Sequence, residues 1–301
     1  MTDNDTSRKI RQRILDCNRF DRSAYRPLII GDHIVGAVTN DIAARLKSHA
    51  DVFAVRDHEI LMQPGLQTPE SRSQVMAKML AAWRKDGLIP GWRDELYPVT
   101  NHFTAPPLLA MERAAVPFFG FCGFGVHING FVVRPDGIHM WVGKRSINKP
   151  TGPGKLDQMV AGGQPLGMTL WDNMIKECGE EASIPEPIAR QAKPVGAISY
   201  SGTRPEGLRN DVLYIYDLML ADDFTPVNGD GEVETFYLWP IKKVLDIVLN
   251  TDHFKFNTAL VVIDFCIRHG IINADLPDYS SIIQGLHTPP LATQFYSKDN
   301  T

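Results

Sequence analysis

The chain has 301 residues, of which 44% are hydrophobic and 22% are charged. At roughly 150 residues per domain, this length predicts about two domains, each large enough to bury a core. Lysine and arginine total 31 against 35 aspartates and glutamates, so the formal net charge is −4 and no basic excess exists to bind nucleic acid nonspecifically.

The cysteines and the most apolar segment bear on where the protein works. The four cysteines lie far apart, without C-x-x-C spacing: Cys17, Cys122, Cys178 and Cys266. We therefore expect neither a zinc site nor a disulfide framework, and a reducing cytoplasm is the expected location. Residues 118–126 are too short to span a bilayer. No apolar signal-peptide core follows the charged N-terminus, so no membrane partner is expected.

The first third of the sequence predicts a small α+β unit. Apolar residues at helical spacing predict helices, and short apolar runs around turns predict strands. In chain order we expect a helix over 7–18, two strands around a turn in 28–38, a helix over 42–50, a hairpin of 52–55 and 59–62, and a helix over 71–85. Residues 104–116 carry two adjacent prolines. Because proline stiffens connectors, we expect an N-terminal domain of residues 1–115 to end there.

From residue 116 onward the pattern changes to strands. They are expected at 127–134, 139–144, 158–161, 195–201, 211–220 and 235–239. Helices are expected at 169–182, 241–249 and 257–269. Strands with helices laid on them predict a sandwich with a mixed sheet in residues 116–285, followed by a tail of 286–301. The fold class expected for the chain is α+β.

A glycine-rich loop over residues 161–167 leads into an acidic helix and is the most informative segment. At about 100° per residue, Glu177, Glu180 and Glu181 fall in one sector of this helix, beside an apolar stripe. Like charges at this spacing cost about 0.2–0.5 kcal/mol per pair. A divalent cation offsets that cost, because carboxylate oxygens suit Mg²⁺ or Mn²⁺. The alternative is a solvated acidic face without a ligand.

Residues 162–184 resemble the Nudix box, G-x5-E-x7-R-E-U-x-E-E-x-G-U with U aliphatic. Gly162 fits the first glycine, and the three glutamates fit the family's metal-binding positions at the correct spacing. Three positions depart from the pattern, where the family has glutamate, arginine and glycine: Met168, Lys176 and Ser183. Asp172 lies one helical turn before Lys176, so we expect these two residues to replace the family's supporting ion pair.

A closer resemblance, over residues 25–279, is to the Nudix subfamily that includes the Nudix half of fungal thiamine pyrophosphokinase and its plant and bacterial relatives. The segments that carry it are 153–157, 216–218, 230–234, 254–257 and 264–270, and residues 91–97 resemble the subfamily's N-terminal domain of unassigned function. The resemblance implies an α/β/α sandwich that hydrolyses a diphosphate bond. The implied substrate is a small diphosphate, either thiamine-diphosphate-like or a nucleoside diphosphate derivative.

The resemblance also implies roles for single residues. The three box glutamates are the expected catalytic residues and metal ligands, and Glu177 is the first choice for the general base or the ligand beside it. The backbone carbonyl of Ala161 is a further implied ligand. Nudix enzymes often recruit an acid from outside the box, for which Glu232 and Glu234 are candidates. The alternative for these two is a polar loop edge.

Diphosphate oxygens also need cationic donors. Arg145 and Lys149 follow a predicted strand, and they are expected substrate contacts together with Arg204. For Arg204 a solvated loop charge is the alternative. Trp92 and Arg93 are expected either to position the substrate or to brace the two domains. The oligomeric state stays open, a homodimer being one option.

Two classes of function remain open. The first is a metal-dependent Nudix hydrolase, which the intact glutamate triplet favours. The second is a Nudix-fold binding or sensor module without catalysis, which the three departures from the box favour. Metal binding by the glutamates and turnover of a diphosphate separate the two.

Overall fold

The structure is a computed structural model that describes residues 3–100 and 102–296. The elements of the first part, in chain order, are α1 (Asp3–Cys17), η1 (Arg22–Ala24), β1 (Tyr25–Ile30), β2 (His33–Thr39), α2 (Asn40–Leu46), η2 (Lys47–His49), β3 (Phe53–Val55), β4 (Ile60–Met62), α3 (Pro69–Lys85), β5 (Leu96–Val99), β6 (Leu109–Glu112), η3 (Arg113–Ala115) and α4 (Val116–Phe119). The remaining elements are β7 (Cys122–Arg134), β8 (Gly137–Arg145), β9 (Leu156–Gln158), β10 (Val160–Gly163), α5 (Leu170–Ala182), α6 (Glu186–Ala189), β11 (Lys193–Arg204), β12 (Gly207–Met219), β13 (Val233–Pro240), α7 (Ile241–Asn250), α8 (Thr258–Arg268), α9 (Tyr279–Gly285) and α10 (Leu291–Tyr296).

A small sheet of order β2-β1-β4-β3 and the hairpin β5-β6 form the N-terminal unit. Strands β1 and β4 run parallel, and the other pairs run antiparallel. The apolar face of α3 packs on this unit through Met76, Leu80 and Trp83, and Trp83 stacks on Phe119. The helix has a defined start because Thr68 caps it in a capping box.

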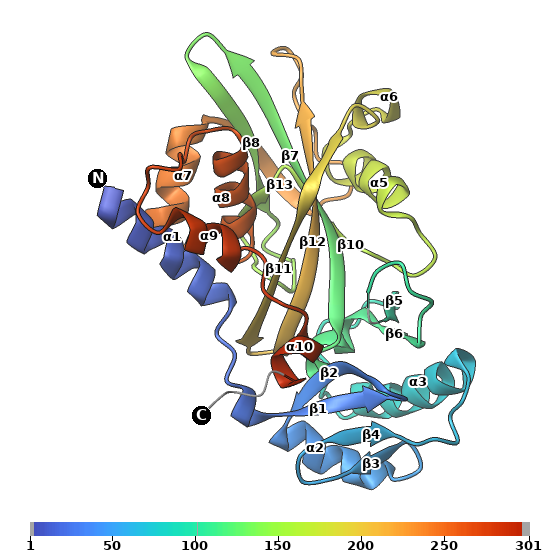
Figure 1. Ribbon diagram of the computed structural model, residues 1–301. Helices are drawn as coiled ribbons and strands as arrows, with labels where there is room; N and C mark the ends of the chain where they lie inside the picture. The colour runs from blue at the N-terminus through green and yellow to red at the C-terminus, as the bar shows by residue number, and fades with distance from the viewer. Residues whose placement is uncertain (1–2, 101, 297–301) are drawn as a thin grey trace.

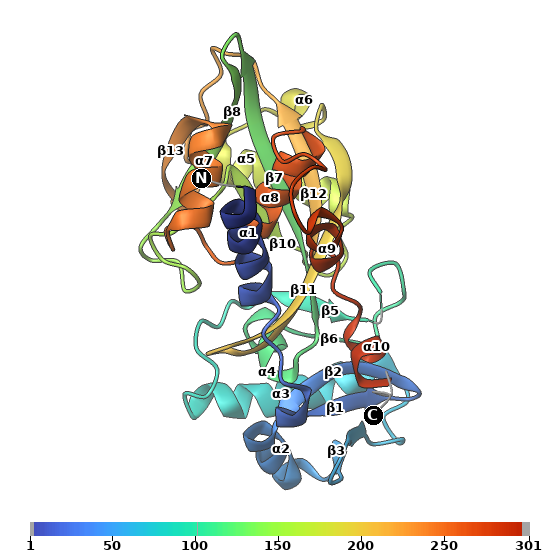
Figure 2. The same cartoon turned by 60° about the vertical axis from the view of Figure 1, so that its left-hand side comes forward.

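The second unit is built on a seven-stranded mixed sheet. Its continuous order is β11-β12-β7-β8-β13, with β10 paired to β7 and β9 to β8. Strands β12 and β7 run parallel, and the remaining pairs of this sheet run antiparallel. Helices α5 and α6 cover one face, and α1, α7, α8 and α9 cover the other (Figure 1, Figure 2). This arrangement confirms the expected α+β class and the α/β/α sandwich.

Most of the expected elements are present to within a few residues of their predicted ends. The segment 104–116 is an exception, because it holds strand β6, which pairs with the unpredicted β5. Its prolines precede the strand, so they do not interrupt the pairing. The strand expected at 158–161 is two strands, β9 and β10, on opposite sides of Met159. Among the described residues, no helix has the length and apolarity needed to cross a membrane.

Helices α1 and α10, near the two ends of the chain, each pack on the unit that is farther from them in the sequence. Helix α1 was expected in the N-terminal domain, but its buried side chains lie in the core of the sandwich with those of α7, α8 and α9. Helix α10, in the described part of the expected tail, packs beside β2 through Leu291. Apolar spacing identifies a helix but not the surface that it covers, which is why the sequence misplaced α1. The boundary at residue 115 stays a prediction.

The packing of α1 on the sandwich is testable within one helix. Ile10 is fully buried in this core, whereas Leu15 is 54% exposed. We expect Ile10→Ala to lower the free energy of unfolding by about 2–4 kcal/mol, because it leaves a cavity. Leu15→Ala serves as the control and should change it by less than about 0.5 kcal/mol. Urea denaturation of both variants gives the answer, and equal effects would contradict this packing.

Candidate active site

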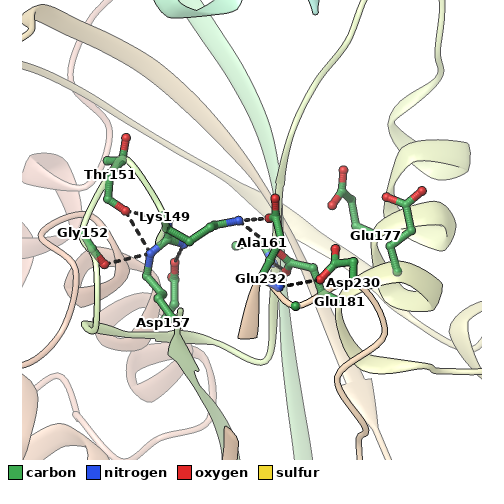
Figure 3. Close-up of polar contacts among 12 residues, drawn as sticks. Lys149, Thr151, Gly152, Asp157, Ala161, Glu177, Glu181, Asp230 and Glu232 are labelled. Atoms are coloured by element: carbon green, nitrogen blue, oxygen red, sulfur yellow. Dashed lines mark hydrogen bonds and ion pairs between the residues drawn. The ribbon is translucent and has the colours of Figure 1, made fainter. Parts of the chain in front are cut away.

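The glycine loop, residues 161–167, is fixed to the sheet on one side and to helix α5 on the other. Strand β10 pairs with β7, so that Gly162 lies opposite Val126. From α5, the carboxylate of Glu181 accepts a hydrogen bond of 2.8 Å from the Ala161 backbone N–H (Figure 3). Asn173 donates a bond of 2.9 Å to the Gly163 carbonyl. The loop and the acidic helix therefore form one rigid unit.

Gly162 allows the closest approach between this loop and the helix. A Cβ atom at this position would lie 2.2 Å from Cδ of Glu177, far inside van der Waals contact. The side chain of Glu177 thus occupies the space that any other residue at 162 would fill. Burial raises the pKa of Glu177, and the ammonium group of Lys176, 3.2 Å away, opposes that rise.

Glu181 is the most deeply buried carboxylate of the box, with 4% of its surface exposed. Desolvation raises its pKa to about 7, against the opposing effect of Lys149, whose Nζ lies 3.7 Å away. Lys149 also forms an ion pair with Glu232, and its own pKa is lowered by burial. Asp230, which the sequence does not single out, lies beside this group in Figure 3, and partial burial raises its pKa.

Glu180 differs from the other two box glutamates because half of its side chain is exposed. Lys176 lies 2.5 Å from Glu180, so it pairs with Glu180 and Glu177 at once. The expected pair between Lys176 and Asp172 is wrong. Asp172 instead accepts a hydrogen bond from the Thr169 hydroxyl at the start of α5, and its backbone N–H donates to that same side chain.

Ser183 shows how one departure from the box is accommodated. It ends helix α5 with φ 50° and ψ 36°, in the left-handed region that favours glycine. The family pattern has glycine there. The chain therefore keeps the backbone turn that the pattern specifies, although serine adopts it at a cost.

The outer expected residues divide into those near the box and those away from it. Glu232 reaches the box through Lys149. Glu234 does not, because it pairs with Lys144 at 2.9 Å on the exposed edge formed by β8 and β13. Arg204 also lies away from the box, and its predicted contact with the substrate stays a prediction. Its guanidinium donates to the Asp16 carbonyl and stacks over Phe256 at 4.0 Å, in a separate hollow beside α1.

Arg145 lies beside the box, and all three nitrogens of its guanidinium donate hydrogen bonds within the chain. It pairs with Asp157 at 2.8 Å and donates to the carbonyls of Thr151 and Gly152. These bonds fold the segment that carries Lys149 back over the sheet. Arg145 therefore holds the position of Lys149, and its predicted contact with the substrate stays a prediction.

A cavity of about 130 Å³ opens beside the glycine loop. We call it the basic cavity because its lining includes six cationic side chains: Arg93, Arg113, Arg145, Lys149, Arg209 and Lys255. Burial lowers the pKa of Lys255 to about 8, and Asp157, 3.6 Å away, opposes that change. The sequence offers no local signal for Arg113, which lies far along the chain from the box. Lys255 belongs to the segment 254–257 that carries the subfamily resemblance, but no role was predicted for it.

Among the described residues, no group of three or more His, Cys, Asp and Glu side chains is arranged to hold a metal ion. Lysine side chains pair with the carboxylates of the box. Lys176 lies between Glu177 and Glu180, and Lys149 lies between Glu181 and Glu232. Each ammonium group thus compensates two carboxylates.

Carboxylates of α5 that are removed from water lie against a rigid glycine loop, next to a cavity lined by cations. This arrangement suits a hydrolase whose substrates carry several phosphate charges. Nudix hydrolase 20, chloroplastic, of Arabidopsis thaliana is 41% identical over 286 residues, which are 91% of this chain and 76% of that protein. Nudix hydrolase 24, chloroplastic, of the same plant is 40% identical over 274 residues, or 90% and 75%. The chain belongs to the Nudix hydrolase family and is a pyrophosphohydrolase of the Nudix type.

Two further comparisons cover parts of the chain. Residues 9–122 match the family described as a domain of unknown function, DUF4743. The NUDIX domain of Shewanella oneidensis NrtR, solved with ADP ribose, is similar to 50% of this chain and 88% of that chain, with 14% identity and a TM-score of 0.39. No residue assignment rests on this distant likeness.

The raised pKa of Glu181 predicts how stability depends on pH when divalent cations are removed with EDTA. Because the pKa rises from 4.5 to about 7, the folded protein holds this proton more tightly than the unfolded chain. The contribution to stability is complete below about pH 4.5 and is lost as the pH rises through about 7. Relative to wild type, Glu181→Gln should therefore gain on the order of 2 kcal/mol between about pH 5 and about pH 8.

Denaturation of both proteins over this pH range measures the difference. Glu186→Gln is the control, because Glu186 is exposed and pairs with Arg190 on the surface. Its difference from wild type should stay flat. A flat difference for Glu181→Gln as well would contradict the raised pKa.

Proposed function

We propose that this protein hydrolyses the diphosphate bond of a small organic diphosphate, in a reaction that depends on Mg²⁺ or Mn²⁺. One observation carries the proposal. Two desolvated glutamates, Glu177 and Glu181, lie against the glycine loop beside the basic cavity. Hydrolysis of a phosphoanhydride needs charge compensation on the phosphates and a group that takes a proton from water, and this arrangement offers both.

The chemistry of the donors fits a hard divalent cation. Glu177, Glu180 and Glu181, with the carbonyl of Ala161, would hold it, and Glu232 is the candidate from outside the box. All of these are oxygen donors, which Mg²⁺ and Mn²⁺ prefer. Once bound, the ion would stabilise phosphate charge and make bound water more acidic. Lys149 and Lys176 compensate the same carboxylates in its absence.

Among the chain's own groups, Glu177 is the proposed proton acceptor. Burial raises its pKa, and a carboxylate is a more effective base when its pKa approaches the working pH. Its position is held by contact with Gly162 rather than by a flexible loop. Arg145 contributes by fixing the segment that presents Lys149 to the cavity.

The proposed substrate is thiamine-diphosphate-like or a nucleoside diphosphate derivative. Support comes from the subfamily resemblance and from the aromatic part of the cavity wall. Tyr97, Phe124, Tyr200 and Phe256 lie along the cavity among the cations. An organic ring needs such an apolar surface, and the diphosphate needs the cations.

The named Nudix hydrolase relatives and the retained glutamates favour a hydrolase over the sensor hypothesis. Ser183 keeps the helix end of the box pattern, and Lys176 pairs with Glu177 and Glu180. The three glutamates are retained in sequence and lie on one helix. The departures at Lys176 and Ser183 therefore leave the three metal-binding glutamates in place, and Met168 replaces a glutamate outside that triplet.

Replacement of Glu181 tests the proposed function directly. Glu181→Gln preserves the shape of the side chain and an acceptor for the Ala161 N–H, but it removes the negative charge. We expect Mg²⁺-dependent hydrolysis of thiamine diphosphate analogues, ADP-ribose and dinucleotides, measured by chromatography of the monophosphate products, to fall by about 100-fold or more. Glu186→Gln is the matched control and should keep wild-type turnover. Full activity of Glu181→Gln would refute the site assignment.

Glu232 and Glu234 make a matched pair, two residues apart. Glu232 contacts Lys149 and lines the basic cavity, whereas Glu234 pairs with Lys144 outside it. We expect Glu232→Gln to lower kcat about tenfold or more and to raise the Mn²⁺ concentration that half-activates the enzyme. Glu234→Gln should match wild type in both measurements. A loss of activity in Glu234→Gln, with none in Glu232→Gln, would contradict these positions of the two residues.

A further inference from the structure

The basic cavity is lined from both units of the fold. Arg93, Tyr97 and Arg113 come from the N-terminal unit, around β5 and η3, and the other lining cations come from the sandwich. The two units are tied together at this point, because the Leu166 N–H of the glycine loop donates to the Leu96 carbonyl of β5 at 3.0 Å. The N-terminal unit is therefore part of the cavity wall.

Arg113 lies directly against the glycine loop. Its Nη2 is 3.0 Å from the point where a Cβ on Gly163 would lie, and the Tyr97 hydroxyl is 1.5 Å from that point. Arg113 pairs with Glu95 at 2.8 Å and lies over the Tyr97 ring at 5.2 Å. It is also close enough to Glu177 to lower the pKa of that carboxyl. Arg113 thus connects the N-terminal unit to the box.

Arg93 is held next to Arg113 by one buried carboxylate. Glu112, 4% exposed, accepts hydrogen bonds from the backbone N–H groups of Arg93 at 2.9 Å and Ala114 at 3.0 Å. The Arg93 side chain forms no ion pair with any residue that the structure describes. Its pKa is lowered by partial burial and by repulsion from Arg113 and Arg145. Arg93 therefore adds a guanidinium group without an ion-pair partner beside Arg113 and Arg145, which are paired with Glu95 and Asp157.

One further polar group at this wall lacks a partner. The Tyr97 hydroxyl is buried and makes no hydrogen bond within the described part of the chain. A buried hydroxyl without a partner loses its hydration at a cost, and a ligand that accepts from it recovers that cost. Unmatched positive charge and an unused donor indicate that this wall binds an anion.

We propose that Arg93 and Arg113 form a phosphate-binding site in the N-terminal unit, which holds one phosphate of the substrate while the box acts on the bond to the next. The site selects substrates with at least two linked phosphate groups over monophosphates. This inference rests on the proposed hydrolysis of a diphosphate. Two guanidinium forks suit phosphate oxygens in a way that a single ammonium group does not.

Calorimetric titration of the full chain with inorganic pyrophosphate in EDTA tests the site without relying on turnover. We expect Arg93→Ala to weaken pyrophosphate binding about tenfold and Arg113→Gln at least as much. Orthophosphate should bind wild type more weakly than pyrophosphate. Arg56→Ala is the control, since Arg56 is an exposed arginine of the same unit that pairs with Glu59, and its affinity should equal that of wild type.

Arg93→Ala removes an exposed side chain that forms no ion pair, so it should fold with an unchanged melting temperature. A loss of binding in this variant therefore reports on the site and not on unfolding. In turnover assays it should raise KM about tenfold and leave kcat within about twofold. Wild-type affinity in Arg93→Ala, or no pyrophosphate binding by wild type, overturns the inference. Pyrophosphate binding that depends on Arg93, without turnover of any diphosphate, supports this site and refutes the proposed function instead.

Discussion

The carboxylate of Glu181 is the interaction on which the site depends. It is removed from water at the end of α5, and it is stabilised by the Ala161 N–H and by Lys149. This contact sets the distance between the glycine loop and the helix, and it thereby brings Glu177 against Gly162. A buried carboxylate costs stability unless it is paired, so the fold retains a group whose benefit lies in the chemistry of the site.

The second feature of the site is that lysine side chains compensate the negative charge of the glutamates. Three glutamates on one helix repel each other, and Lys176 and Lys149 each lie beside two carboxylates of the cluster. The repulsion is therefore relieved by the chain itself. On the part of the cavity wall formed by the N-terminal unit, positive charge is in excess, because Arg93 has no carboxylate partner among the described residues. The basic cavity lies beside the glycine loop on which the acidic helix packs, and this arrangement suits a substrate whose phosphates are bound together with a cation.

Much of the fold and the centre of the site could be predicted from the sequence. Helix α5, its glutamates and the glycine loop are local features, so spacing alone located them. The positions of the other predicted residues depend on contacts that the sequence does not show. Within α5, Asp172 contacts the N-cap Thr169 instead of pairing with Lys176, which is a local contact that the spacing of charges does not reveal. Arg204 donates a hydrogen bond to Asp16 of α1, and Glu234 of β13 pairs with Lys144 of the neighbouring strand β8. Arg113 directly follows β6, and the pairing of β6 with β5 brings it to the site. The prolines in this part of the sequence give no indication of that pairing.

The central claim is that the buried carboxylates of α5 form a cation site whose charge lysines compensate when no cation is bound. Calorimetric titration with Mn²⁺ in buffers of different ionisation enthalpy measures both affinity and proton release. The account predicts one or more bound Mn²⁺ ions with protons released near neutral pH, because Glu181 must lose its proton to act as a ligand. Binding without proton release at any pH, or no binding of Mn²⁺, would contradict it.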